Sequence, residues 1–381
     1  MQGALDGILV VALEQAVAAP FCTQRLVDAG ARVIKIERSD GETARHYDAT
    51  AKGVSAYFAW LNRGKQSAVL DLKTSRDLAV FETMLSRADV LVQNLIPGAL
   101  ARMGLDADAL SRRFPRLIVV NIAGYGLDTD YADMRAYDML VQAESGIASI
   151  TGTPEHPCKV GISAADIAAG MTAYSAVLEA LISRSVTGHG KHVDVAMFDV
   201  MADWMTVPLL HLEQAGRVTG RQGLAHSVIY PYGPMTCADG TLMVAVQNNA
   251  EWVRFCDKVL LTPERARDPR FLTNSDRLTH RTQLDELIGH HVGALTVDQL
   301  IARLEAGQIA WGRLRSVQDL SGHPALRRID VPLPGGATMS MPRPPARDAE
   351  FQSGEVPGLG ASTDQIRTEF SSRNDPAPET R

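Results

Sequence analysis

The chain of 381 residues lacks the patterns that mark several common protein classes. Its four cysteines are scattered and form no CxxC pair, so we expect no zinc framework and a reducing, cytoplasmic location. No uncharged apolar run reaches membrane-spanning length, and the first residues lack the basic start of a signal peptide. A formal net charge of −6 argues against nucleic acid or a membrane surface as a partner.

Three patterns of catalytic sites are also missing. The first turn after a predicted strand, at 14–20, holds no GxGxxG, so the usual dinucleotide site is unsupported. Ser163 stands in no GxSxG context, which argues against a serine hydrolase. The ten histidines show no metal-ligand spacing, and we expect no metal site.

One carboxylate, Asp166, stands alone among small and apolar residues. From Ile167 to Ile182 apolar residues recur at helical spacing, which predicts a helix that ends near Arg184 and has Asp166 at its start. An aspartate at this place can cap backbone N–H groups. Its small neighbours would equally let a substrate approach, so that the carboxylate acts as a nucleophile. This stretch alone leaves both roles open.

Strand and helix patterns alternate through the first half of the chain. The sequence predicts strands at 8–13, 32–37, 67–72, 90–94, 117–122 and 191–196. Helices are predicted between them, at 22–29, 76–87, 99–103, 107–113 and from 137. This alternation predicts an α/β fold with an open, Rossmann-like parallel sheet.

The composition changes near Gly216 and again near Arg328. We expect a large α/β domain over 1–215, a linker over 216–235 and a small α+β domain over 236–328, which contains a hairpin. A proline-rich extended segment over 329–370 is expected to return to the large domain, and 371–381 to form a disordered tail.

Basic residues follow several predicted strands. They are Arg38, Arg63, Lys65, Lys73, Arg102 and Arg135. Because ligands of open α/β sheets bind outside the carboxyl ends of the strands, this set would suit a phosphorylated cofactor. Ordinary surface solvation is the alternative for each of them.

Motifs along nearly the whole chain, from Leu5 to about Ile366, resemble the family III CoA-transferases. This family also contains alpha-methylacyl-CoA racemase and the carnitine and formate CoA-transferases. The motifs, in order, are LDGI at 5–8, AAP at 18–20, GARVIKIE at 30–37, LNRGK at 61–65, LDLK at 70–73, ADV at 88–90, NLIPG at 94–98, MG at 103–104, GYG at 124–126, AYD at 136–138, ADI at 165–167 and GHG at 188–190.

The resemblance implies roles for particular residues. Asp166 would be the catalytic carboxylate, and Val17 and Ala18 would line the thioester pocket. Tyr137 is either a hydrogen-bond donor to the substrate carboxylate in that pocket or a packed core tyrosine. Coenzyme A, a co-substrate and not a tightly bound cofactor, would contact Arg38, Leu70, Lys73, Asn94, Arg102, Met103 and Arg135. The resemblance also implies an interlocked homodimer.

Departures from the family patterns narrow the range of reactions that the chain is expected to catalyse. Tyr137 stands where the racemase branch has a catalytic histidine, and Asn248 where it has a glutamate, so racemisation is disfavoured. Val17 stands where the formate and oxalate branch has a glutamine, and the glycine run of that branch is missing. The pattern most resembles transferases that move CoA from succinyl-CoA to mesaconate, itaconate or citramalate. The alternatives are transfer within one diacid, an acyl-CoA racemase and a non-catalytic CoA-binding protein.

The expected mechanism is nucleophilic catalysis. Asp166 attacks the donor thioester to form a mixed anhydride, CoA then forms an aspartyl thioester, and the acceptor acid takes CoA by the reverse steps. We expect the helix N-terminus to keep Asp166 ionised at neutral pH. Backbone N–H groups near Gly161 and at 18–19 are candidate donors to the oxyanion. Water would be excluded by Val17, Phe21, Tyr137 and Met171.

Overall fold

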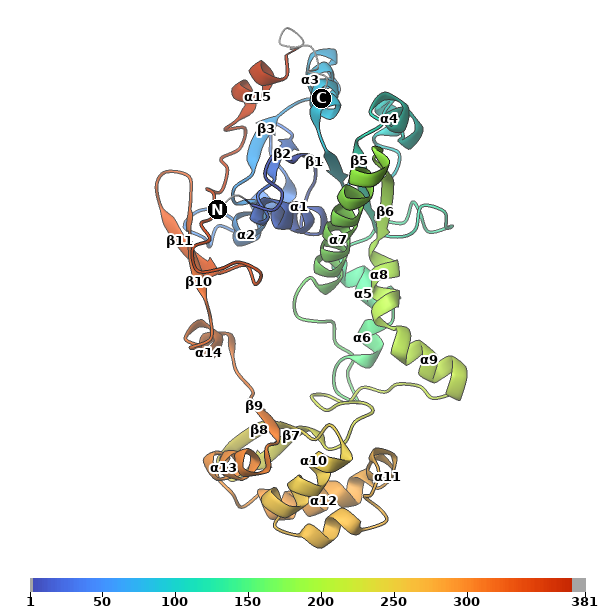
Figure 1. Ribbon diagram of the computed structural model, residues 1–381, viewed down its shortest axis with the longest axis vertical. Coiled ribbons are helices and arrows are strands. Elements are labelled where there is room, and N and C mark those ends of the chain that lie inside the picture. Colours follow the sequence, from blue (N-terminus) through green and yellow to red (C-terminus); the bar gives the residue numbers. More distant parts are fainter. Residues whose placement is uncertain (1–2, 372–381) are drawn as a thin grey trace. The chain divides into compact units, whose positions relative to one another are not determined.

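The computed structural model describes residues 3–371, which form two compact units (Figure 1). The first contains the chain up to Ile147, Val160–Val207 and the chain from Arg327; the second contains Ala148–Lys159 and Pro208–Leu326. The first unit leaves the expected large domain at Val207 and not at 215, and it excludes 148–159. Arg221 ties 148–159 to the second unit. Its guanidinium donates to the carbonyl oxygens of Ser149, Thr153 and Pro154 at 2.7–3.1 Å. Of the predicted tail at 371–381, all but Ser371 lies outside the described residues.

A six-stranded parallel sheet forms the centre of the first unit, which confirms the predicted fold class. Its order is β3-β2-β1-β4-β5-β6, with β1 (Leu9–Leu13), β2 (Arg32–Glu37), β3 (Gln66–Val69), β4 (Val90–Gln93), β5 (Ile118–Ala123) and β6 (His192–Ala196). From β1 the chain adds β2 and β3 on one side and then β4, β5 and β6 on the other, so a topological switch point lies between β1 and β4. Such a switch point opens a crevice at the carboxyl ends of the strands. The predicted strand at 67–72 ends early because Asp71 starts a turn that caps the next helix.

Helices cover both faces of this sheet (Figure 1). One face packs against α1 (Ala18–Asp28), α5 (Asp138–Glu144), α7 (Ala164–Thr187) and α8 (Met197–Trp204). The opposite face packs against α3 (Ser75–Arg87), α4 (Ala107–Arg113) and α15 (Thr363–Glu369). Both faces of every central strand are therefore buried, which explains their nearly continuous Val, Ile and Leu.

The long helix α7 lies against α1 through small residues. A Cβ on Gly170 would lie 2.6 Å from the carbonyl oxygen of Ala18, so only glycine allows this approach. Ala165, Ala168, Ala169 and Ala173 are buried in the same core. By length and composition alone α7 could also cross a membrane, a test that core helices of globular proteins pass as well. Within the first unit it is a core helix.

The last part of the chain belongs to the first unit. Strands β10 (Arg328–Pro332) and β11 (Thr338–Pro342) form an antiparallel pair whose apolar side packs on Phe58 of α2 (Ala56–Asn62). Farther on, Glu369 of α15 forms a bidentate ion pair with Arg32 of β2 at 2.5 and 2.7 Å. The two remaining short segments of the first unit are 3₁₀ turns, η1 (Thr43–His46) and η2 (Ala101–Met103), the latter where a helix was predicted.

The second unit has its own core, built around Trp252, Phe255, Phe271 and Leu284. A three-stranded antiparallel sheet contains the predicted hairpin and consists of β7 (Tyr232–Cys237), β8 (Gly240–Ala245) and β9 (Ala310–Arg313). Its helical segments are α10 (Asn249–Arg254), η3 (Phe255–Val259), η4 (Pro263–Arg267), α11 (Asn274–Thr279), α12 (Arg281–Val292), α13 (Val297–Gly307) and α14 (Val317–Ser321). The segments α6 (Ile147–Ile150) and α9 (Thr206–Ala215) span the boundaries of the two units.

Candidate active site

Asp166 is the third residue of α7 and is half-buried. Ser163 precedes the helix as its N-cap residue, and its side chain caps no backbone N–H group. Within residues 3–371, no donor lies in hydrogen-bonding geometry to the Asp166 carboxylate. The simple capping role that the sequence allowed is therefore not the one that Asp166 has here.

The capping role belongs instead to Asp138, the first residue of α5. Its Oδ1 accepts a hydrogen bond from the backbone N–H of Ala165 at 2.8 Å, and its Oδ2 accepts one from Gln142 Nε2 at 2.8 Å. The buried Gln142 in turn accepts a hydrogen bond from the N–H of Val160 at 2.8 Å and donates to the carbonyl of Ile162. Asp138 and Gln142 thus hold both ends of the segment that leads into α7.

The environment of Asp166 raises its pKa to about 7, first because the carboxyl is desolvated and second because the charge of Asp138 is close. Burial and the charge of Asp138 therefore oppose the ionisation at neutral pH that we expected the helix N-terminus to favour. The free energy cost of removing the carboxylate from water exceeds the gain from the helix N-terminus. A carboxylate whose pKa is raised by burial, without hydrogen-bond partners, is a candidate functional group.

The first turn of α1 lies beside the first turn of α7. Val17 is the N-cap residue of α1 and packs in one cluster with Phe21, Leu61 and Ile167, the residue after Asp166. In the described part of the chain, the N–H groups of Val17, Ala18 and Ala19 donate to no acceptor. Backbone N–H groups without an acceptor are the kind of donor that an oxyanion requires.

Two tyrosines, Tyr47 and Tyr137, belong to the surroundings of Asp166. Tyr137 is 68% exposed and belongs to no core cluster of the described residues. Tyr47, which the sequence analysis missed, has a raised pKa because it is partly buried and lies near the charges of Glu42, Asp166 and Tyr137. It stacks edge-on against Tyr57 with 5.7 Å between ring centroids. Tyr47 sits in a loop after β2, where no periodic pattern could single it out.

The residues expected to contact CoA all follow carboxyl ends of the parallel strands or the turns beyond them. Arg38, Lys73, Arg102 and Arg135 are exposed, and Arg38 lies 3.5 Å from Asp40. Leu70 is buried in the core beneath α3, so only its backbone is available to a ligand. Met103 packs against the same core.

Asn94 has a structural task at the switch point. Its Oδ1 accepts the N–H of Gln15, and its Nδ2 donates to the carbonyl of Gln15, both at 2.9 Å. The side-chain amide therefore bridges the ends of β1 and β4 and holds the turn that leads to Val17. Its hydrogen-bonding atoms are already engaged by the protein.

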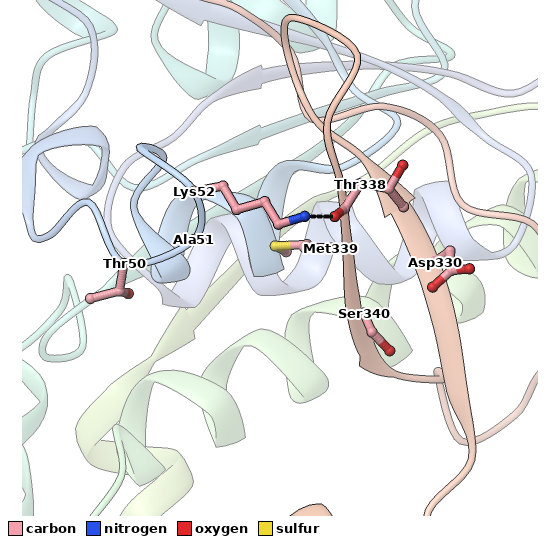
Figure 2. A pocket seen from close by; sticks show the side chains of 7 residues that line it. All are labelled: Thr50, Ala51, Lys52, Asp330, Thr338, Met339 and Ser340. Atoms are coloured by element: carbon pink, nitrogen blue, oxygen red, sulfur yellow. Dashed lines mark hydrogen bonds between the residues drawn. The ribbon is translucent and has the colours of Figure 1, made fainter.

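A separate open hollow in the first unit lies between the turn at 50–52 and the β10–β11 hairpin (Figure 2). Figure 2 shows Lys52 reaching across it to donate to the carbonyl oxygen of Thr338 at 2.5 Å. None of the expected site residues lines this hollow. Within residues 3–371, no group of three or more His, Cys, Asp or Glu side chains is arranged to hold a metal ion.

The model of CoA-transferase family III matches residues 5–363, so the chain belongs to this family. The chain is 34% identical to a succinate–glutarate CoA-transferase of Agrobacterium fabrum over 90% of its length and 88% of the relative's. It is 32% identical to an acetyl-CoA:oxalate CoA-transferase of Acetobacter aceti, covering 97% and 96% of the two chains.

A succinyl-CoA:mesaconate CoA-transferase of Haloarcula hispanica is 28% identical, covering 96% of this chain and all of the relative's. Among solved structures, a CaiB/BaiF family protein from Brucella suis is 32% identical and superposes with a TM-score of 0.80, covering 97% of this chain and all of the other. The protein is a CoA-transferase that acts on carboxylic acids, with CoA as co-substrate.

Proposed function

We propose that the protein transfers CoA from an acyl-CoA to a small dicarboxylic acid through covalent intermediates on Asp166. The observation that carries this proposal is the Asp166 carboxylate itself. It is half-buried, accepts no hydrogen bond within residues 3–371, and precedes Ile167, which packs against Val17 at the start of α1. A carboxylate in this setting is poorly solvated and accessible, as a nucleophile must be.

The reaction proceeds in balanced steps. An oxygen of Asp166 attacks the thioester carbonyl, the carbon–sulfur bond breaks, and CoA leaves as a thiolate from a mixed anhydride. The thiolate attacks the aspartyl carbonyl, which releases the donor acid and forms an aspartyl–CoA thioester. The acceptor carboxylate attacks this thioester, and the returning thiolate cleaves the new anhydride at the acceptor carbonyl. The new acyl-CoA leaves, and Asp166 is again a carboxylate.

The N–H groups at 17–19 stabilise the tetrahedral intermediates, because each intermediate carries a negative oxygen that the ground state lacks. Tyr137 donates a hydrogen bond to the free carboxylate of the bound acid. Val17, Phe21 and Met171 supply apolar walls that protect the anhydride from water. Of these, Val17 and Phe21 are buried against α7.

The exposed cations at the carboxyl edge of the sheet bind the phosphates of CoA. Lys73, Arg38, Arg102 and Arg135 have guanidinium or ammonium groups in solvent, where a phosphate can reach them. Leu70 contributes its backbone, Met103 a partly buried apolar surface, and Asn94 acts by holding the turn at Gln15.

Succinyl-CoA is the proposed donor, and mesaconate, itaconate or citramalate the proposed acceptor. A relative named for mesaconate supports this choice, and the relative named for glutarate points to the same class of acid with two carboxyl groups. Val17 leaves the pocket apolar where a branched or unsaturated carbon chain would lie.

The active form is proposed to be an interlocked homodimer. No residue of α9 is buried, although this helix carries Val207, Leu209, Leu210 and Leu212. Ile182 and Val186 on α7 are also exposed, Val186 to 84%. A surface with this many exposed apolar side chains is typical of a protein interface, and a second copy of the chain would bury it.

A transferase assay tests the proposal. Wild type is incubated with succinyl-CoA and a panel of acids, and the new acyl-CoA is measured beside Asp166→Ala and Asp166→Asn. The proposal requires transfer by wild type and its loss in both variants. Isomerised thioester without an added acid would indicate transfer within one diacid, and deuterium exchange of a chiral 2-methylacyl-CoA would indicate a racemase. Binding of CoA without turnover would indicate a non-catalytic protein.

A further inference from the structure

We propose that Glu42 is a positioning residue that holds the turn at Ala16 and thereby aims the N–H groups at 17–19 toward the reacting carbonyl. This inference rests on the proposed function of Asp166 and of these N–H groups. Glu42 stands in the loop after β2, far from Ala16 in sequence, and nothing in its sequence context marks it.

Glu42 contacts the turn directly. Its Oε2 accepts a hydrogen bond from the N–H of Ala16 at 2.7 Å and a longer one from the N–H of Ala44 at 3.2 Å. Its Oε1 lies 2.9 Å from the ammonium group of Lys35. Both Glu42 and Lys35 are buried, so the carboxylate is fixed on two sides and cannot turn away into solvent.

Ala16 needs this support because of its backbone conformation. Its φ of +62° lies in the left-handed region, which is unfavourable for a residue with a side chain. Such a conformation persists only where the surroundings hold it, and it occurs often at functional sites. The short hydrogen bond that the N–H of Ala16 donates to Glu42 holds the chain where it turns from β1 into α1.

Neighbouring buried charges fix the two sides of the turn but not its centre. Glu14 pairs with Lys65 at 2.7 Å and with Lys35 at 3.3 Å, and Thr23 donates to its other oxygen. Lys65 also donates to the carbonyl oxygen of Pro20 in the first turn of α1. Asn94 holds Gln15 from the other strand. Only Glu42 among these groups bonds to Ala16.

Loss of the contact between Glu42 and Ala16 should affect the transition state more than the binding of acyl-CoA. If the turn relaxes, the N–H groups at 17–19 shift away from the oxyanion, while the exposed cations that bind CoA are unaffected. Interactions made only in the transition state lower kcat when they are lost, and leave KM nearly unchanged.

The test compares Glu42→Gln with the matched control Glu37→Gln. Glu37 is equally buried and bonds to Arg45 and Ser67, but not to the turn. In Glu42→Gln the amide can place its oxygen toward Lys35 or toward Ala16 but not toward both. We expect kcat to fall about 10- to 100-fold with KM for acyl-CoA changed less than about threefold. Glu37→Gln should lower the melting temperature and keep kcat.

A second variant separates positioning from a general loss of stability. Glycine adopts positive φ without penalty, so Ala16→Gly removes the strain that Glu42 must hold. We expect Ala16→Gly to restore part of the kcat of Glu42→Gln, at least about threefold, without restoring its melting temperature. Glu42→Asp, whose carboxylate is one methylene short of the turn, should lose kcat in the same way.

Wild-type kcat in folded Glu42→Gln and Glu42→Asp would overturn the inference, as would a fall in kcat that Ala16→Gly fails to relieve. These results differ from a failure of the proposed function. In that case Asp166→Ala would keep its activity, or wild type would transfer no CoA, whatever residue stands at 42.

Discussion

Asp138 caps the helix that carries Asp166 and at the same time raises the pKa of Asp166. The N–H of Ala165 donates to Asp138 at 2.8 Å, so the capping bond that an aspartate at the start of α7 could have taken is already made. The negative charge that makes this bond lies close to the Asp166 carboxyl and opposes its ionisation. Asp138 is thus hydrogen-bonded on both oxygens, while no donor within residues 3–371 bonds to Asp166.

The pH dependence of the reaction follows from this pair. Asp166 attacks only as a carboxylate, and its pKa is about 7, so kcat/KM should rise with pH through about 7 and level off above it. In Asp138→Asn the repulsion is lost while the amide oxygen can still accept from Ala165. The rise should therefore move to lower pH, yet remain above the usual range of aspartate because burial persists. Rates of Asp138→Asn and wild type at pH 5–9 would contradict this account if both profiles were flat or superimposable.

Removal of the Asp166 charge should stabilise the protein. A carboxyl whose pKa is raised on folding opposes folding once pH exceeds its unfolded pKa, and the full cost is reached above the folded pKa of about 7. Asp166→Asn should raise the free energy of unfolding by about 1–2 kcal/mol at pH 7.5, since a pKa unit corresponds to ~1.4 kcal/mol and solvent screens a half-exposed group. The gain should shrink as pH falls toward 4. Denaturant titrations at both pH values measure it, and a less stable variant at pH 7.5 would refute the assignment.

Variants of Asn94 and Lys73 should distinguish a residue that supports the fold from a residue that binds the ligand. Asn94→Ala removes two hydrogen bonds to Gln15, so the free energy of unfolding should fall by about 1–3 kcal/mol, together with kcat.

Lys73→Ala changes an exposed side chain, so stability should stay within about 0.5 kcal/mol. Its KM for acyl-CoA should rise about 3- to 10-fold, and less so in high salt, because the lost contact is electrostatic. A stable Asn94→Ala variant, or a Lys73→Ala variant with unchanged KM, would be inconsistent with these roles.

The exposed apolar side of α9 tests the proposed homodimer. Leu210→Asp places a charge where a second copy is expected to cover the helix, so light scattering should report a monomer. Leu210→Ala at the same position removes size without adding charge and should remain dimeric. Dimers in both variants would show that this side of α9 is not part of the interface.

Much of the fold could be predicted because it depends on local patterns. The strand at 32–37 and the helix at 107–113 were predicted with the bounds that the structure has. The apolar spacing after Asp166 predicted α7, apart from one turn at its end. Short helices such as α2, and α15 near the C-terminus, were missed because packing against distant segments decides them.

Less of the candidate site than of the fold could be predicted from the sequence. Asp166 stood out as a charged residue within an apolar helix start, and the resemblance to the family gave it the catalytic role. The roles of Asp138 and Glu42 depend on contacts with Ala165 and Ala16, which are distant along the chain. From the sequence alone, a carboxylate in a loop is expected to be a solvated surface group. No sequence pattern indicates that Glu42 is buried beside Lys35. The direction of the Asp166 pKa shift likewise depends on burial, which only the fold supplies.

Covalent trapping would identify the nucleophile. The protein is incubated with succinyl-CoA, quenched with hydroxylamine or reduced with borohydride, and digested for mass spectrometry. We expect a hydroxamate, or the reduced side chain, at Asp166, and we expect neither product without the thioester or in Asp166→Asn. Modification at any other residue, or full turnover by Asp166→Ala, would contradict the proposed mechanism.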